Sequence, residues 1–437
     1  MSSLEPVSAR PEDHPDGCVT DSSMAELAVA RSVMPLLEGP SQVPLSILKT
    51  RHEMFVLNKL DLGVSLPWDT TRPLQFYWCC RALELCESLP EDCVDRFNAA
   101  VKAWEHPSGG YSSGNGMEPH MMVTFGVCQS ACVLGRDTWA SVNAEGVGRF
   151  ISRCRHSSGG IRAYPDGEYD TRTTYAAVVC AALTGLLHSS EGTHPASVYM
   201  DSPNGQPTTP RPTSSSTCPT QEWEQTARFI LSCQGPDGGF SAVPDSETHA
   251  AYTYCALAAL AILGRLEDAN LHKCARFIAH RQTEYGGFHG RPNKLVDTCY
   301  AFWMMGAASI LHRVIVPSHA PVSFMTLRDT VHDAYGYDRT IVDRPALQNW
   351  LYRVAQVGAG GLRDKPGCSP DVYHTCYGLS GMCFSQGGDT AWGGKTLMSG
   401  VSLSDVLPVS DPRFNCGAGK PDAMAARFIA QRERERE

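Results

Sequence analysis

Two kinds of hydrophobic pattern alternate along the chain and predict a helical fold. The stretch Glu222–Cys233 places Trp223 and Ile230 on one apolar face, which is typical of a helix that lies on a surface. The stretch His249–Leu263, HAAYTYCALAALAIL, is apolar on nearly every side, so we expect it to be buried between neighbouring helices. Strand signals are weak, because sustained alternation of apolar and polar residues is rare.

A glycine pair followed by an apolar residue recurs between the two kinds of helix. The pairs are Gly109-Gly110, Gly159-Gly160, Gly238-Gly239, Gly286-Gly287 and Gly360-Gly361. Apart from two longer gaps, the period is about 50 residues, which indicates a repeat architecture. The sequence therefore predicts an all-α fold, an α–α barrel (toroid) of helix-pair repeats whose apolar helices form the inner layer around a central apolar cavity.

The same patterns suggest how the chain is divided. We expect a mostly disordered N-terminal extension at 1–39, with a short helix over Met24–Leu37, because Ser, Pro, Asp and Glu are abundant there. The barrel should span 40–430 and be interrupted by a low-complexity loop at 189–220 and a second insertion around 317–337. A charged tail should follow at 431–437.

Composition narrows the classes of function. The chain has 437 residues, a formal net charge of −9 and 42% hydrophobic residues, which suits a large core and argues against a general nucleic-acid binder. No apolar run reaches the ~18 residues of a transmembrane segment, and no secretory signal pattern is present. The 18 cysteines are therefore expected to be reduced thiols of a cytoplasmic protein.

Polar side chains gather at the start of each apolar helix. They are Asp170 and Arg172, Glu247 and His249, Asp297 and Cys299, Asp371 and His374, and, in one repeat, His120 alone. If the inner helices run parallel, these residues share one rim of the barrel, where helix N-termini also favour an anion such as a diphosphate. The basic candidates for binding it are Arg172, His249, Arg291 and Lys294. Each of them alone is more often a solvated charge or a satisfied histidine.

The cavity below this rim should be aromatic. It would be lined by Tyr175, Tyr252, Phe302 and Trp303. A cationic rim above an apolar cavity suits a long hydrocarbon that carries a phosphate.

Asp297, Cys299 and His374 offer an oxygen, a sulfur and a nitrogen, a set compatible with zinc. Three protein ligands would leave a fourth position open, which is the pattern of a catalytic zinc site. Spacing along the chain does not pair His374 with the other two, and only the repeat argument brings it to the same rim. The alternative is a capping aspartate beside a buried cysteine.

Long stretches of the chain resemble the farnesyltransferase β subunits of the protein prenyltransferase β-subunit family. The stretches GRPNKLVDTCYAFW (290–303) and GGLRDKPGCSPDVYHTCYGLSG (360–381) carry the resemblance, which extends from about residue 70 to 428. The resemblance implies an α–α barrel that works in an obligate heterodimer with a prenyltransferase α subunit. It also implies transfer of farnesyl from farnesyl diphosphate to the cysteine thiol of a C-terminal CaaX sequence.

The resemblance assigns roles residue by residue. It implies zinc ligands at Asp297, Cys299 and His374, a magnesium ligand at Asp364, and a catalytic, diphosphate-binding Tyr300. The other implied diphosphate ligands are His249, Arg291 and Lys294. The implied isoprenoid-binding residues are Arg172, Tyr252, Cys255 and Trp303. The residues implied to flank the lipid and the acceptor peptide are Trp78, Tyr373 and Tyr377.

Three positions depart from the family pattern. Leu74 stands where a tryptophan usually shortens the lipid pocket, Phe125 replaces a tyrosine, and Ala250-Ala251 replaces a Gly-Gly pair. Leu74 favours the main alternative, a type I geranylgeranyltransferase β subunit. A terpene cyclase is a weaker alternative, because the chain lacks an acidic DxDD motif. A non-catalytic helical scaffold is the third, and it would bind no zinc.

Overall fold

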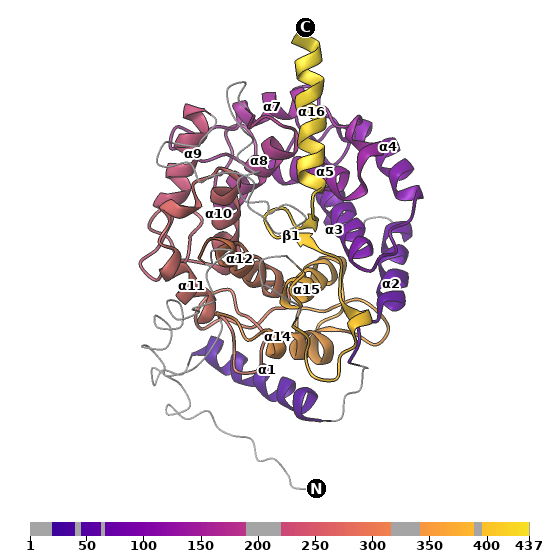
Figure 1. The fold of residues 1–437 in the computed structure, drawn as a ribbon, viewed down its shortest axis with the longest axis vertical. Coiled ribbons are helices and arrows are strands. Elements are labelled where there is room, and N and C mark those ends of the chain that lie inside the picture. Colours follow the sequence, from indigo (N-terminus) through magenta and orange to yellow (C-terminus); the bar gives the residue numbers. More distant parts are fainter. Residues whose placement is uncertain are drawn as a thin grey trace.

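The computed structural model is a ring of helices in two layers, and it describes residues 20–39, 45–62, 66–188, 220–315, 341–388 and 396–436 (Figure 1). The inner helices are α3 (Arg72–Leu85), α5 (Met121–Leu134), α8 (Thr171–Leu183), α10 (Ala250–Ile262), α12 (Tyr300–Ile315) and α15 (Val372–Ser385). Each inner helix contacts the next, and α15 contacts α3, so the layer closes on itself. The predicted all-α barrel of helix pairs is confirmed. The expected insertions at 189–220 and around 317–337 lie almost wholly outside the described residues.

The outer layer holds the amphipathic helices, as the patterns predict. They are α2 (Lys49–Leu62), α4 (Asp92–Trp104), α7 (Ala144–Arg153), α9 (Gln221–Ser232), α11 (Leu271–Ala279) and α14 (Arg344–Trp350), which continues into the π-helical turn η5 (Leu351–Ala355). On α9 the apolar side chains Trp223, Ala227 and Ile230 are buried, while the charged residues of the first turn remain outside the core. Shorter helical elements are α6 (Arg136–Trp139), η2 (Leu66–Thr71), η4 (Leu266–Asp268) and η7 (Leu403–Asp405).

The recurring glycine pairs form the turn between an outer and an inner helix. The first glycine of the pair in the α9–α10 repeat, Gly238, has φ +94°, and a Cβ there would lie 2.2 Å from the carbonyl oxygen of Lys273 in α11. Glycine is therefore needed both for the left-handed backbone and for close approach to the next outer helix. Gly109, Gly159, Gly286 and Gly360 meet the neighbouring outer helix in the same way.

A small hairpin lies inside the ring at one end of the barrel. It consists of the antiparallel strands β1 (Ser410–Asp411) and β2 (Cys416–Gly417), joined by residues 412–415 (Figure 1). The Tyr175 hydroxyl donates to the Arg413 carbonyl at 2.9 Å, and the Tyr254 hydroxyl donates to the Pro412 carbonyl at 2.8 Å. These bonds fix the hairpin against the inner helices α8 and α10.

The two ends of the described chain are helical. Residues Asp21–Glu38 form α1, a longer helix than the short one expected within a disordered extension. A reciprocal capping pair, Thr20 and Ser23, stabilises its start, and Val33 is fully buried. At the other end α16 (Lys420–Arg436) projects from the ring and includes most of the expected charged tail (Figure 1). In the described ranges, no helix is both long enough and apolar enough to cross a membrane.

Candidate active site

Asp297, Cys299 and His374 come together although they belong to different repeats. Their candidate ligand atoms all lie within 4.8 Å of one another, and His374 Nε2 is 3.2 Å from Asp297 Oδ1. Cys299 is buried, whereas the other two side chains are partly exposed. One carboxylate, one thiol and one imidazole fit a zinc ion and leave room for a fourth ligand.

The turn before α12 holds Asp297 and Cys299 in place. The Cys299 amide donates to Asp297 Oδ1 at 2.7 Å. The amide and hydroxyl of Thr298 both donate to the Asp364 carbonyl, at 3.0 and 2.8 Å. This turn therefore lets two residues that are only two positions apart face the same point, which a helix would not allow.

Asp371 orients the imidazole of His374. As the N-cap of α15 it accepts the His374 amide at Oδ1, at 2.8 Å, and it pairs with His374 Nδ1 at Oδ2, at 2.6 Å. The second ring nitrogen, Nε2, faces Asp297 and is buried without a hydrogen-bond partner of good geometry among the described residues. A carboxylate on one ring nitrogen, with the second nitrogen directed at other candidate ligands, is the arrangement of a metal-binding histidine.

The charges of the three residues depend on one another. Burial would lower the pKa of His374, but the neighbouring carboxylates of Asp297 and Asp371 outweigh burial and raise it to about 10. Burial, with the Asp297 carboxylate beside it, raises the pKa of the Cys299 thiol well above its usual value. A divalent cation at this point would oppose both effects, because it favours an anionic sulfur and a neutral imidazole.

His249 and Tyr300 form a second group beside the first. His249 is the N-cap of α10, where its Nδ1 accepts the Ala251 amide at 3.1 Å, and its Nε2 lies 3.2 Å from the Tyr300 hydroxyl. Burial, with Arg291 close by, lowers the pKa of His249 to about 4. The ring is therefore neutral near pH 7, and Nε2 carries its proton.

The three other predicted cations lie in different environments. Arg172 pairs with Asp170 at 3.3 Å, and Arg291 pairs with Glu247. Both line the central cavity. Lys294 is exposed and, like Tyr300, is not part of the cavity wall.

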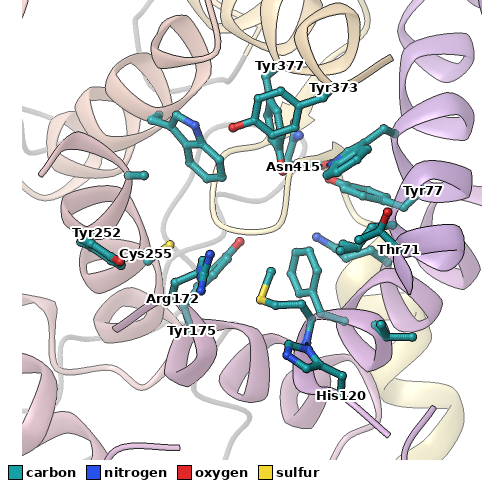
Figure 2. A pocket seen from close by; sticks show the side chains of 18 of the residues that line it. Thr71, Tyr77, His120, Arg172, Tyr175, Tyr252, Cys255, Tyr373, Tyr377 and Asn415 are labelled. Carbon is teal, nitrogen blue, oxygen red and sulfur yellow. Dashed lines mark hydrogen bonds between the residues drawn. The ribbon is translucent and has the colours of Figure 1, made fainter. Parts of the chain in front are cut away.

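A cavity of about 1010 Å³ occupies the centre of the barrel (Figure 2). The aromatic residues predicted to line it, Tyr175, Tyr252, Phe302 and Trp303, all do so. Trp78, His249, Cys255, Tyr373 and Tyr377 are further predicted residues in its wall. Figure 2 shows Arg172, Tyr252 and Cys255 on one side of the space and Tyr373 and Tyr377 on another.

Aromatic contacts join the cavity wall across three inner helices. The Trp78 ring packs edge-on against Tyr373 at 5.1 Å between centroids, and Trp303 packs against Tyr377 at 4.7 Å. The Trp78 indole donates to the Tyr377 hydroxyl at 3.4 Å. Such a wall is apolar and rigid, and Tyr373 places it next to the metal-ligand candidate His374.

Asp364 lies on the loop that precedes α15, next to the metal-ligand group. It pairs with Lys365, and its Oδ1 is buried without a hydrogen-bond partner among the described residues. Burial and the nearby Asp297 raise its pKa. Leu74, Phe125 and Ala251, which belong to the three departures noted in the sequence, contribute to the cavity wall, and Ala250 is fully buried.

Some of these arrangements have no counterpart in the sequence patterns. The role of Asp371 could have been found from the Asp-x-x-His spacing at the start of a helix, which is that of an N-cap and its N3 residue. The presence of Gln129 and Asn415 in the cavity wall could not have been found from the sequence, because Asn415 belongs to a hairpin whose strands have only two residues each.

Known proteins share this fold and much of this sequence. A family model, the prenyltransferase alpha-alpha toroid domain, matches residues 47–415. The protein farnesyltransferase subunit beta of Schizosaccharomyces pombe is 29% identical over 422 residues, which cover 94% of this chain and 98% of that protein. The geranylgeranyl transferase type-1 subunit beta of Arabidopsis thaliana is 32% identical over 36% of this chain and 38% of that protein.

The fold also matches a solved structure, that of Candida albicans protein geranylgeranyltransferase-I complexed with GGPP. The TM-score is 0.62 at 18% identity, and the match covers 88% of this chain and 99% of that one. Since the family model spans most of its length, the chain belongs to the prenyltransferase α–α toroid family. Within this family, the resemblance to protein farnesyltransferase β subunits is confirmed.

Proposed function

We propose that this chain is the catalytic β subunit of a zinc-dependent protein farnesyltransferase. The enzyme would transfer farnesyl from farnesyl diphosphate to the cysteine thiol of a C-terminal CaaX sequence. The observation that carries the proposal is the meeting of Asp297, Cys299 and His374, with the imidazole Nε2 directed at the other two, beside the rim of an aromatic cavity.

Each part of the site has a task in this reaction. Zinc at the three ligands would lower the pKa of the acceptor thiol, so that a thiolate is present near neutral pH. The aromatic wall binds the hydrocarbon and excludes water from it. Negative charge grows on the diphosphate as it leaves, and Arg291, Lys294 and Arg172 stabilise that charge from the rim. The Tyr300 hydroxyl, which accepts from neutral His249, can donate its own proton to a diphosphate oxygen.

Two further components belong to the proposal. Asp364 would hold magnesium near the diphosphate, because its buried Oδ1 lacks a partner and its charge repels that of Asp297. An α subunit would complete the diphosphate site with a lysine, and the heterodimer would act in the cytoplasm. Removal of magnesium is expected to slow transfer without releasing zinc.

A type I geranylgeranyltransferase β subunit is the second candidate, because Leu74 is smaller than the tryptophan usual at this place in the cavity wall. Competition between farnesyl and geranylgeranyl diphosphate for one CaaX peptide decides between them. The proposed function predicts mainly farnesylated product. Mainly geranylgeranylated product would overturn it in favour of the alternative.

A further inference from the structure

One cation of the cavity wall already has a carboxylate partner on another loop. Arg291 lies in the loop before α12, and Glu247 lies two residues before His249, the N-cap of α10. Arg291 Nη1 donates to Glu247 Oε2, and both residues line the central cavity. Carboxylate and phosphate oxygens bind a guanidinium through the same N–H groups. Glu247 therefore accepts from an N–H group that a diphosphate oxygen would need if it is to bind Arg291.

The loop that carries Arg291 is tied to the start of α10, just after Glu247. The Ala250 amide of α10 donates to the Gly290 carbonyl at 2.8 Å. On the other side, His289 Nδ1 donates to the Arg291 carbonyl at 2.8 Å. These bonds hold the backbone of the two segments in a fixed relation. Separation of the ion pair therefore needs only the rotation of two long side chains.

A second pair of this kind shows why Glu247 in particular can be displaced. Asp170 pairs with Arg172 at 3.3 Å, but its Oδ1 also accepts the Thr173 amide at 2.7 Å, so the carboxylate is fixed as the N-cap of α8. The Asp170 side chain is only 11% exposed, whereas that of Glu247 is 57% exposed. Water can therefore solvate the Glu247 carboxylate after it leaves Arg291. An ion pair this exposed is weak, and a diphosphate can break it.

We propose that Glu247 is a displaceable counter-ion that competes with the diphosphate for Arg291. This inference rests on the proposed function. While a diphosphate is bound, Arg291 donates to its oxygens and the Glu247 carboxylate is solvated. When the diphosphate leaves, the ion pair forms again. Glu247 is thus a positioning residue that lowers the affinity for the diphosphate group, which limits how strongly released diphosphate blocks the next turnover.

Removal of the Glu247 charge should tighten the binding of diphosphates. Dissociation constants of inorganic pyrophosphate and of farnesyl diphosphate are measured by equilibrium titration of the heterodimer, wild type beside Glu247→Gln. We expect both constants to fall about three- to fivefold in the variant, because an exposed competitor of the diphosphate is removed. Asp245→Asn is the matched control and should leave both constants unchanged. It removes one negative charge from the same loop, at an exposed position whose φ of +61° asparagine also adopts.

A double-mutant cycle distinguishes competition for Arg291 from a general effect of charge. In the Arg291→Gln background, the additional change Glu247→Gln should leave the dissociation constant of farnesyl diphosphate unchanged, because the cation for which Glu247 competes is absent. Farnesyl diphosphate is the probe for this step, because its hydrocarbon contributes affinity that pyrophosphate lacks.

The outcomes separate this inference from the proposed function. Weaker binding by Glu247→Gln would show that Glu247 holds Arg291 in place for the diphosphate, and unchanged binding would show that the two do not compete. Either result overturns the inference, as does equal tightening with and without Arg291, while wild-type binding and transfer of farnesyl remain. If the wild-type heterodimer does not bind farnesyl diphosphate, the proposed function itself fails.

Discussion

At the scale of single residues, the position of one carboxylate decides whether the metal-ligand group can work. Asp371 caps α15 and also accepts the His374 Nδ1 proton, so that Nε2 points at Asp297 and Cys299. The same side chain therefore serves helix stability and imidazole orientation. These two tasks can be separated, because asparagine is also a good N-cap but is a weaker, neutral acceptor for the imidazole.

We predict that Asp371→Asn weakens zinc binding about 10- to 100-fold while the fold is retained. The physical reason is a less basic and less firmly oriented His374. Zinc affinity is measured by competition with a chelator of known affinity, and the melting temperature is recorded in parallel. Asp170→Asn is the control, since Asp170 caps α8 in the same way but lies outside the metal-ligand group. Equal zinc loss in both variants would mean that capping, and not orientation, is what matters.

The sequence predicts the residues of this group better than it predicts their partners. Asp297, Cys299 and His374 stand at the start of apolar helices, and the repeat alone suggests one shared rim. Gln129 is a mid-helix residue with no signal, since its place in the cavity depends on a hairpin formed by residues far along the chain. Long-range contacts of this kind leave no periodic pattern.

At the scale of elements, the glycine-pair turns set the spacing of the outer helices. The hydrophobic pattern predicts which helices are outer and which are inner, because an outer helix has one apolar face and an inner helix is apolar on several sides. The hairpin β1–β2 was not predictable, because two-residue strands are too short to show alternation. The turns connect each outer helix to an inner helix. Their first residue is glycine because the next outer helix lies too close for a Cβ atom.

We predict that Gly238→Ala destabilises the chain by at least ~2 kcal/mol, and that Gly135→Ala costs only ~1 kcal/mol. Both glycines have positive φ, but a Cβ at Gly238 would collide with Lys273, whereas at Gly135 it meets nothing within 4 Å. Urea unfolding of the two variants measures the difference. Equal losses of stability would show that backbone conformation, and not close approach to the next outer helix, is why glycine stands at this turn.

At the scale of the whole molecule, the ring must close between its first and last repeats. His52 of α2 makes this junction: its Nδ1 accepts the Gly361 amide at 2.9 Å, and its Nε2 is 2.9 Å from Gln356 Oε1. Burial lowers the pKa of His52 to about 4. His52 therefore stays neutral in the folded protein down to about pH 4, whereas in the unfolded chain it takes up a proton near pH 6.5.

We predict that the closed ring loses stability as the pH falls from about 6.5 to about 4. His52 contributes its full stabilisation above the unfolded pKa, and protonation of the unfolded chain removes up to ~3 kcal/mol of it over that range. The replacement His52→Gln should flatten the pH dependence of urea unfolding by up to one proton. Parallel curves for wild type and His52→Gln would contradict this account of ring closure.

The central claim is that one carboxylate and one thiol from one repeat and one imidazole from another hold a catalytic metal. The most direct measurement is metal analysis of the purified heterodimer, wild type beside Cys299→Ala and His374→Ala, with prenyl transfer assayed on the same samples. Cys274→Ala, which removes a buried thiol from α11, is the control. The account predicts one zinc per wild-type and control heterodimer and the joint loss of zinc and transfer in the two ligand variants. Full transfer by a variant that retains no zinc would contradict it.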